Sequence, residues 1–173
     1  MPKPLALWIT GPVGSGKSSI ANLLGKRIGA EVLRLDAIRL AITPNPKYTN
    51  DERNFVYRAL AYMGYLLWKQ GKPVILDATD NTGIGRKTAK KLISNLRIIQ
   101  LECDIEVCMQ REKKRKLPKH IKLKDLYARA KQRKIRLPGQ GAELIIEKKP
   151  WLILDTSKTT TDEAVEVILR KLS

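Results

Sequence analysis

Eight residues near the amino terminus carry the clearest chemical signal in this sequence. Gly11 to Ser18 read GPVGSGKS, which matches the pattern G-x-x-x-x-G-K-[ST]. Gly14 and Gly16 allow a tight turn that brings backbone amides close to an anion, and consecutive inward-pointing amides form an anion-binding cavity. Lys17 adds a positive charge for phosphate oxygens, and Ser18 offers a hydroxyl to Mg²⁺. The pattern therefore predicts a loop that binds the phosphates of a nucleoside triphosphate such as ATP.

The sequence on either side of this phosphate loop supports the prediction. Residues 5–10 form a short apolar run typical of a buried strand, and residues 20–28 have the pattern of an amphipathic helix that ends at Gly29. Strand, loop and helix thus follow in the required order. The expected ATP contacts are Gly11, Pro12, Val13, Gly14, Ser15, Gly16, Lys17, Ser18, Ser19, Arg111 and Thr156.

Two carboxylates follow later apolar runs and could act on the same phosphate. Asp36 comes directly after the run at residues 31–35, where it could accept the proton of an attacking hydroxyl or simply cap a short helix. Arg39 lies three residues further, on the same helix face, and could hold an anionic acceptor. Asp77 ends the next run, where it could help Ser18 hold Mg²⁺, partly through water, or belong to a simple turn. The sequence leaves open which of the two acids is the base.

A strongly basic segment lies between Arg111 and Arg136. It holds thirteen Lys and Arg residues against two acids, and so carries +11 of the formal net charge of +17. Arg111 and Arg115, four residues apart on a predicted helix, could neutralise charge on a transferred phosphoryl group. The segment could also be a solvated lid or attract nucleic acid, although Tyr127 is the only aromatic residue in it that could stack on a base. We expect a lid at residues 111–142.

Short apolar runs alternate with helical patterns along the whole chain. The runs that we expect to be strands are residues 5–10, 31–35, 74–76, 96–101 and 151–154. T-x-x-E capping patterns at Thr49 and Thr160 begin two of the helices. This alternation predicts an α/β fold of three layers, with a five-stranded parallel sheet, helices on both faces and a helical basic lid, in a single domain at 1–173. Ligands of such sheets bind at the carboxyl ends of the strands, where Asp36 and Asp77 fall.

Composition restricts the class of protein further. A chain of 173 residues with 43% hydrophobic and 29% charged residues fits an ordinary globular domain. No apolar run approaches the roughly 20 residues of a membrane-spanning helix, and the first one leads straight into the phosphate loop, unlike a signal peptide. We therefore expect a cytoplasmic protein without a membrane partner. Cys103 and Cys108 match no metal or redox spacing and are expected to be small apolar residues.

Several motifs, in chain order, resemble those of adenylylsulfate kinases. They are the phosphate loop, the D-x-x-R of Asp36 and Arg39, Cys108–Arg111, Asp125–Ala130 and Leu154–Thr156, and together they span most of the chain. The resemblance implies transfer of the γ-phosphoryl group of Mg-ATP to the 3′-hydroxyl of adenylylsulfate. It also implies that the lid arginine Arg111 lies over ATP. The residues that it places at the acceptor are Asp36, Arg39, Asn54 and Arg58.

The chain departs from that family at several places. Arg34 stands where the family has a second acid, two residues before the D-x-x-R aspartate. Asp77–Asp80 replaces a Ser-Pro-aromatic segment and looks more like polynucleotide-kinase-type P-loop kinases. We therefore expect an ATP-dependent kinase, with adenylylsulfate as the first acceptor and the hydroxyl of an RNA or DNA end as the alternative. A nucleotide-gated switch that hydrolyses ATP slowly is a third hypothesis, but no residue stands out as positioning the attacking water.

Overall fold

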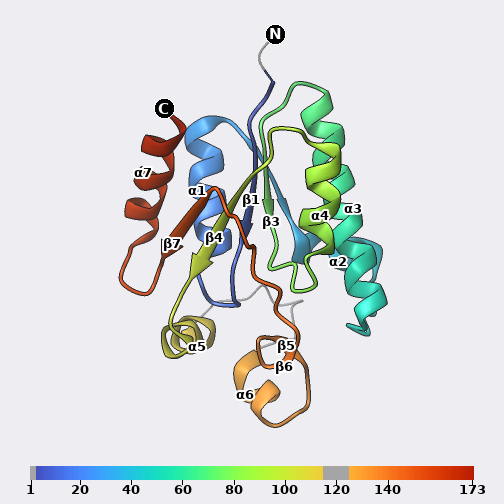
Figure 1. The fold of residues 1–173 in the computed structure, drawn as a ribbon. Coiled ribbons are helices and arrows are strands. Elements are labelled where there is room, and N and C mark those ends of the chain that lie inside the picture. Colours follow the sequence, from blue (N-terminus) through green and yellow to red (C-terminus); the bar gives the residue numbers. More distant parts are fainter. Residues whose placement is uncertain (1–2, 115–124) are drawn as a thin grey trace.

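The chain forms an α/β structure around a parallel sheet of five strands in the order β2-β3-β1-β4-β7, as shown in Figure 1. The computed structural model describes residues 3–114 and 125–173. The strands of the main sheet are β1 (Ala6–Thr10), β2 (Glu31–Arg34), β3 (Val74–Asp77), β4 (Arg97–Glu102) and β7 (Leu152–Asp155). The helices are α1 (Lys17–Ile28), α2 (Leu35–Ile42), α3 (Asn50–Lys69), α4 (Ile84–Leu92), α5 (Ile105–Lys114), α6 (Leu126–Lys131) and α7 (Thr161–Leu172). The predicted fold class is thereby confirmed.

Helices cover both faces of the sheet, so the structure has three layers. Figure 1 shows α1 and α7 on one face, and α2, α3 and α4 on the other. The central strand β1 is fully buried and alternates between the two cores, because successive side chains of a strand point to opposite faces. Trp8 packs with Tyr57 and Leu60 beneath α3. Leu7 and Ile9 pack with the residues of α1 and α7 on the opposite face.

The two capping patterns begin helices, but they differ in detail. At α7, Thr160 and Glu163 form the complete reciprocal box. At α3, the Thr49 hydroxyl accepts the amide of Glu52, as expected. The Glu52 carboxylate does not complete the box with the Thr49 amide. It accepts hydrogen bonds from the backbone amides of Lys47 and Tyr48 instead, at 2.6 and 3.3 Å. The first turn of α3 therefore holds the segment that precedes it, which includes the Tyr48 ring.

The region expected to be a lid lies beyond the carboxyl ends of the main strands, as Figure 1 shows for α5 and α6. The lid region includes a short helix, α6, at Leu126–Lys131. This helix is followed by two short paired strands that the sequence did not predict, β5 (Leu137–Pro138) and β6 (Gly141–Ala142). Arg115, one of the two predicted lid arginines, lies outside the described residues.

The ends of the main strands differ from the expected ones by about one residue. The second strand ends at Arg34, so that Leu35 already belongs to α2. The fourth and fifth strands each begin and end one residue later than expected, at Arg97–Glu102 and Leu152–Asp155. Hydrophobicity locates a buried run, but the hydrogen bonds to neighbouring strands decide where pairing begins and ends.

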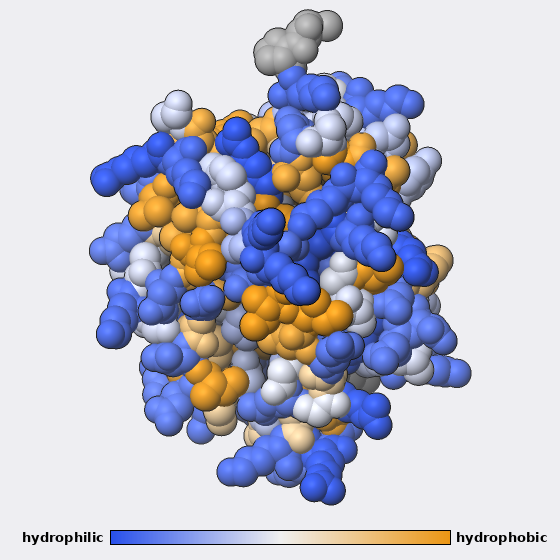
Figure 2. Space-filling model, viewed as in Figure 1, coloured by the Kyte–Doolittle hydropathy of each residue, from blue (hydrophilic) through white to orange (hydrophobic). Residues whose placement is uncertain are grey.

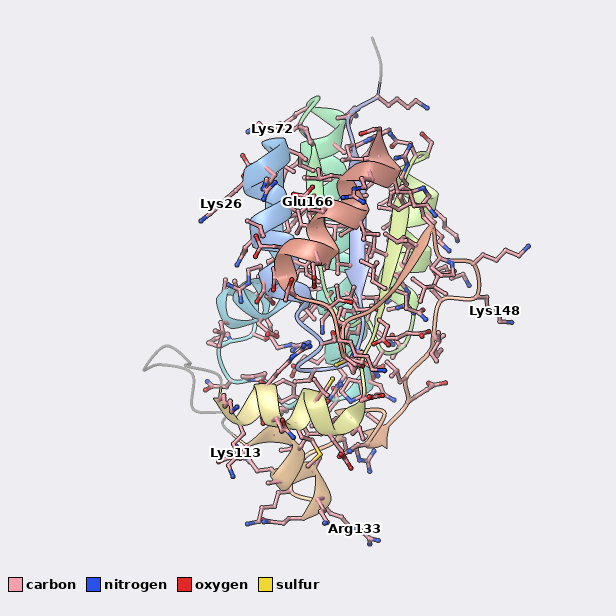
Figure 3. The ribbon with its side chains drawn as sticks, turned by 90° about the vertical axis from the view of Figure 1, so that its left-hand side faces the viewer. Lys26, Lys72, Lys113, Arg133, Lys148 and Glu166 are labelled. Carbon is pink, nitrogen blue, oxygen red and sulfur yellow. The ribbon has the colours of Figure 1, made fainter. Side chains whose placement is uncertain are left out.

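Positive charge is spread over the surface and is not confined to the lid region. Figure 3 shows Lys113 and Arg133 at one end of the molecule, and Lys26 and Lys72 toward the other end, with Lys148 projecting from the side. The face drawn in Figure 2 is mostly hydrophilic, with separate hydrophobic patches. No helix within residues 3–114 and 125–173 combines the length and apolar character needed to cross a bilayer.

Helix α4 approaches the sheet closely because Gly85 has no side chain. A Cβ at this position would lie 2.6 Å from Cη2 of Trp8 and 3.0 Å from Cβ of Tyr57. The Trp8 ring cannot easily move aside, since it is fully buried and its indole N–H donates to the carbonyl of Ala78 at 3.0 Å. This packing fixes the distance between α4 and the central strand.

We expect Gly85→Ala to lower the free energy of unfolding by about 1–3 kcal/mol, because overpacking outweighs the gain in helix propensity. Gly64→Ala in α3 is the matched control. Its new methyl group would meet the side chain of Leu76, which is smaller than the Trp8 ring and is not held by a side-chain hydrogen bond, so the loss should be smaller. Urea unfolding of both variants gives the two values. Equal effects at the two positions would show that the Trp8 contact does not limit the approach of α4.

Candidate active site

The phosphate loop leaves the amino end of α1 open. Gly14 and Gly16 have φ angles of 83° and 89°, in the left-handed region that favours glycine. Helix α1 has no side-chain cap and no acidic residue in its first turn. Its first amides and the positive end of its dipole are therefore available to an anion. A Cβ on Gly14 would also overlap the Cys108 carbonyl, so α5 packs directly on the loop.

Other segments hold the loop in this shape. The Thr156 hydroxyl, from the end of β7, donates to the Ser15 carbonyl at 2.9 Å. The Tyr127 hydroxyl, from α6, donates to the carbonyl of Val13 at 2.6 Å. Thr156 was expected to contact ATP, and its buried hydroxyl instead supports the loop backbone, while its contact with ATP stays a prediction. Tyr127 is a loop contact that the sequence did not reveal, since nothing in a single sequence pairs residues so far apart.

Ser18 and Asp77 meet beside the loop. The Ser18 hydroxyl donates to Oδ2 of Asp77 at 2.6 Å, and the Asp77 carboxylate is only 5% exposed. Burial raises the pKa of Asp77, while the positive charge of Lys17 and the Ser18 hydrogen bond partly lower it. Lys17 also donates from Nζ to the Pro12 carbonyl at 2.7 Å. The loop lysine, the loop serine and the acid at the end of β3 are thus brought together.

The chemistry of this pair fits a magnesium ion. Hydroxyl and carboxylate oxygens are hard ligands, and Mg²⁺ in kinases is typically held by one or two carboxylates together with substrate phosphates. Within the described residues, no group of three or more His, Cys, Asp or Glu side chains could hold a metal by itself. An ion at Ser18 and Asp77 would therefore depend on nucleotide phosphates for its remaining ligands.

A second group of side chains lies on α2 and around the start of α3. Arg39 is buried, and its Nη1 lies 3.8 Å from Oδ1 of Asp36, whose side chain is 63% exposed. The guanidinium carbons of Arg39 and Arg53 lie 5.2 and 5.9 Å from the centre of the Tyr48 ring. Arg53 also donates from Nε to the Tyr48 carbonyl at 3.0 Å. Two guanidinium groups and one aromatic ring therefore form a cationic cluster next to Asp36.

A cavity of about 230 Å³ adjoins this cluster. It is lined by Tyr48, Thr49, Asn50, Arg53, Arg136 and Ala142, so it lies between the start of α3 and the end of the lid region. A larger cavity of about 410 Å³ lies at the carboxyl end of α1, around Gly29 and Ala30. The smaller one is the better candidate for a substrate, because its position next to Arg53 and Tyr48 connects it with the charged side chains.

Two of the predicted acceptor residues, Asn54 and Arg58, lie on α3. Asn54 accepts a hydrogen bond from the Thr82 hydroxyl at 2.7 Å and so fixes the segment after β3. Arg58 is exposed on α3, and it is Arg53 that contacts Tyr48. The acceptor roles of Asn54 and Arg58 stay predictions. Arg53 could have been found from the sequence, because it falls on the buried stripe of α3, where a charged residue requires partners.

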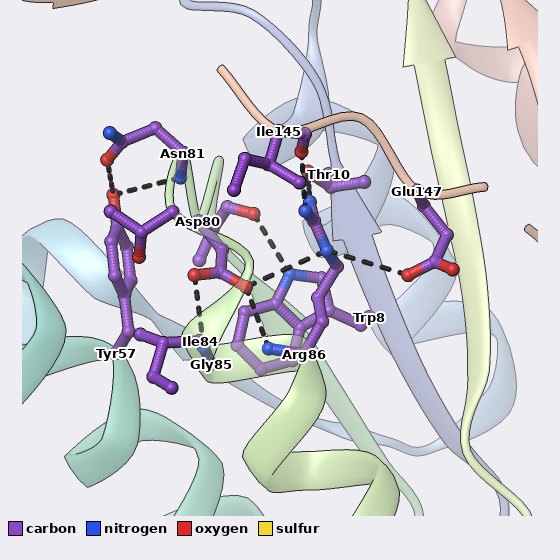
Figure 4. A network of polar contacts seen from close by, with 12 residues as sticks. Trp8, Thr10, Tyr57, Asp80, Asn81, Ile84, Gly85, Arg86, Ile145 and Glu147 are labelled. Atoms are coloured by element: carbon purple, nitrogen blue, oxygen red, sulfur yellow. Dashed lines mark hydrogen bonds and ion pairs between the residues drawn. The ribbon is translucent and has the colours of Figure 1, made fainter. Parts of the chain in front are cut away.

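The segment after β3 is a buried polar network rather than a simple turn, as Figure 4 shows. The carboxylate of Asp80 is fully buried and accepts the amides of Gly85 and Arg86, at 3.1 and 2.7 Å. The Arg86 guanidinium donates to the Thr10 hydroxyl at 2.8 Å and to the Ile145 carbonyl at 2.6 Å. Burial raises the pKa of Asp80, although the Arg86 amide and charge oppose the rise. This network fixes the end of β1, from which the phosphate loop departs.

The lid arginine Arg111 is held at the ends of β4 and β7. It donates from Nη2 to the Thr156 carbonyl at 2.8 Å and from Nη1 to the Cys103 sulfur at 3.6 Å. Cys108 is fully buried, and burial raises the pKa of its thiol to about 12, so it is protonated at neutral pH. Cys103 and Cys108 are both free thiols. The predicted role of Arg111 at ATP stays a prediction.

Two named relatives are similar in sequence to this chain over most of their length. The chain is 29% identical over 171 residues to a probable adenylyl-sulfate kinase of Pyrococcus abyssi (strain GE5 / Orsay), covering 95% of this chain and 92% of the relative. It is 28% identical over 182 residues to an adenylyl-sulfate kinase of Lactiplantibacillus plantarum (strain ATCC BAA-793 / NCIMB 8826 / WCFS1), covering 99% and 82%.

Solved structures and family models agree on the fold. The structure of the Mycobacterium tuberculosis APS kinase in complex with AMPPNP and APS has a TM-score of 0.84 at 24% identity, with 99% of both chains covered. At that level of identity, the likeness establishes the fold alone. A family model described as an AAA domain matches residues 7–136, a range that contains the phosphate loop, Asp36 and Asp77. The chain therefore belongs to this AAA-domain family of P-loop proteins.

Proposed function

We propose that this protein is an ATP-dependent kinase that transfers the γ-phosphoryl group of ATP to the 3′-hydroxyl of adenylylsulfate. One observation carries the proposal: Ser18 of the phosphate loop is bonded to the buried Asp77, and Asp36 with Arg39 stands beside this pair. The names of the similar adenylyl-sulfate kinases support the choice of acceptor. The proposal implies a compartment that supplies ATP, such as the cytoplasm.

In this proposal the loop amides and Lys17 hold the phosphates, and Ser18 and Asp77 hold Mg²⁺, partly through water. When bound, the ion neutralises charge on the phosphates and so makes the phosphoryl group easier to transfer. Lys17 acts as a second positive charge that does not depend on the ion. Arg111 has the role of a lid arginine, and Arg115 would add a second one.

The burial of the two acids suggests how they divide the work. Asp77 is 5% exposed and its carboxylate already accepts the Ser18 hydroxyl, which suits a metal ligand better than a base. The Asp36 side chain is 63% exposed, so an acceptor hydroxyl can reach it. Asp36 is therefore the better candidate for the base that accepts the proton of the attacking hydroxyl.

The acceptor side favours a small anion over a polymer. Arg39 and Arg53 provide two buried positive charges next to the Tyr48 ring, and a cavity of about 230 Å³ adjoins Arg53 and Tyr48. Figure 3 shows Lys26 and Lys72 toward the opposite end of the molecule from Lys113, so positive charge on the described residues is not confined to the lid region. Asn54 and Arg58 remain further candidates for acceptor contacts.

The decisive experiment measures ATP turnover with adenylylsulfate and with 5′-hydroxyl oligonucleotides, each at 50 and 200 mM salt. We expect turnover of adenylylsulfate with a shallow salt dependence, because one or two arginines would contact it. Lys17→Ala should abolish turnover and leave the fold intact, since Lys17 belongs to the phosphate loop and is not one of the buried core residues. A polymer held by four phosphate contacts would lose roughly a hundredfold in affinity over this range. Turnover of oligonucleotides alone would replace adenylylsulfate by a polynucleotide as the acceptor.

The role of Asp36 is tested separately by Asp36→Asn, which keeps the shape of the side chain and removes its negative charge. We expect kcat to fall by a factor on the order of 10² to 10⁴, with ATP affinity nearly unchanged, because a base acts in the transition state. Stopped-flow or coupled assays give kcat, and calorimetry gives the affinity. A mild effect here together with a severe loss of kcat in Asp77→Asn would exchange the two roles.

Asp77 should also lower stability at neutral pH. Burial raises its pKa above the ordinary value of 3.8, so the folded state holds this proton more tightly than the unfolded state does. The stabilisation that comes from protonated Asp77 is therefore fully present below about pH 4 and is lost as the pH rises through the raised pKa. Asp77→Asn removes the titration, and its unfolding free energy relative to the unmodified protein should be higher at pH 7 than at pH 4.

Asp155→Asn is the control, because the pH dependence of its unfolding free energy should have the opposite sign. Hydrogen bonds from Ser157 lower the pKa of this exposed acid, so its contribution is present at neutral pH and is lost as the pH falls. Denaturant unfolding at pH 3, 4 and 7 separates the two cases. If both variants change with pH in the same direction, burial does not determine the pKa of Asp77.

A further inference from the structure

Arg34 brings a guanidinium group to the proposed metal ligand. It is the last residue of β2 and is aligned in the sheet with Asp77, the last residue of β3. Its Nε lies 3.8 Å from Oδ2 of Asp77, which is the oxygen that accepts the Ser18 hydroxyl. That separation is too long for a hydrogen bond. The two groups therefore form an ion pair that is close but loosely held.

The donor that faces Asp77 is left unsatisfied. Nε of Arg34 is buried and has no hydrogen-bond partner within residues 3–114 and 125–173. The side chain as a whole is 38% exposed, so it is not enclosed by the fold. A buried N–H without an acceptor is costly, and a partly exposed arginine can move to satisfy it. The geometry is that of a side chain whose preferred acceptor is something other than Asp77.

The charges around Asp77 also favour the binding of an additional anion. Lys17, Arg34 and Asp36 all act on the pKa of Asp77, and Arg39 lies beside Asp36. Three positive charges thus face two carboxylates. An acid at position 34 would have produced two positive charges against three carboxylates. With arginine there, the end of the sheet attracts a polyanion even before a metal ion binds.

We propose that Arg34 is a phosphate-binding residue of the transfer site, which pairs with Asp77 in the absence of nucleotide and contacts the terminal phosphate when nucleotide is bound. If Asp77 turns to a divalent ion, Arg34 loses its counter-charge and needs another anion. The planar guanidinium offers five N–H donors in a fork that matches phosphate oxygens. The inference rests on the proposed use of the loop for ATP and is independent of the acceptor.

The test compares ATP with ADP, because only ATP carries the terminal phosphate. Calorimetry in EDTA, and again with magnesium, measures the affinity of both nucleotides for the unmodified protein and for Arg34→Met. In Arg34→Met we expect the affinity for ATP to fall about tenfold or more, because a hydrogen bond between charged groups is lost. The affinity for ADP should change less than about threefold. Arg34→Lys, which keeps the charge, should recover part of the loss.

Arg27→Met is the matched control. Arg27 also pairs with a carboxylate, Glu166 at 2.8 Å, and its side chain is 43% exposed, but it lies in the last turn of α1, away from the loop. This variant should bind ATP and ADP as the unmodified protein does, and thermal melts verify that every variant is folded. Should Arg34→Met fail to fold, the ATP-to-ADP ratio of Arg34→Lys is compared with that of the unmodified protein, and an unchanged ratio overturns the proposal.

Equal losses for ATP and ADP in Arg34→Met, or no loss for either, would mean that Arg34 only neutralises Asp77. This outcome differs from a failure of the proposed function. A protein that binds ATP but does not phosphorylate adenylylsulfate leaves the Arg34 result intact. A protein that binds neither nucleotide, with or without magnesium, contradicts the kinase proposal and the inference together.

Discussion

The hydrogen bond between Ser18 and Asp77 is the interaction on which the arrangement of the site depends. A carboxylate that is 5% exposed costs free energy unless donors and positive charges surround it. Ser18 supplies the donor, and Lys17 and Arg34 supply the charges. The buried acid thereby ties the phosphate loop to the ends of β2 and β3. The same requirement makes Asp77 unfavourable for stability at neutral pH and useful for holding a cation.

The rest of the fold keeps this contact in place from two sides. On one side, Thr156 and Tyr127 hold the carbonyls of the phosphate loop. On the other, the buried pair of Asp80 and Arg86 fixes the end of β1, where the loop begins. A site built on strand ends and buried hydrogen bonds is already shaped for its ligand, so little binding energy is spent on ordering it.

The acceptor side is built differently, from two buried guanidinium groups and one exposed carboxylate. Arg39 and Arg53 share the Tyr48 ring, and Asp36 extends toward solvent beside them. Family membership accounts for the phosphate loop, but it leaves the acceptor open. The choice of a small anionic acceptor rests on this cluster, on the adjoining cavity and on the names of the similar kinases.

The sequence by itself determined the phosphate loop, the strands of the parallel sheet and the caps at Thr49 and Thr160, because each is encoded by neighbouring residues with fixed spacing. Only the tertiary structure decided that Arg53, and not Arg58, contacts Tyr48. It also decided that Asp77 is buried and Asp36 is exposed, although both lie at or just beyond the carboxyl end of a strand. Such partners are set by the packing of segments far apart in the chain, and periodicity along one segment holds no record of what packs against it.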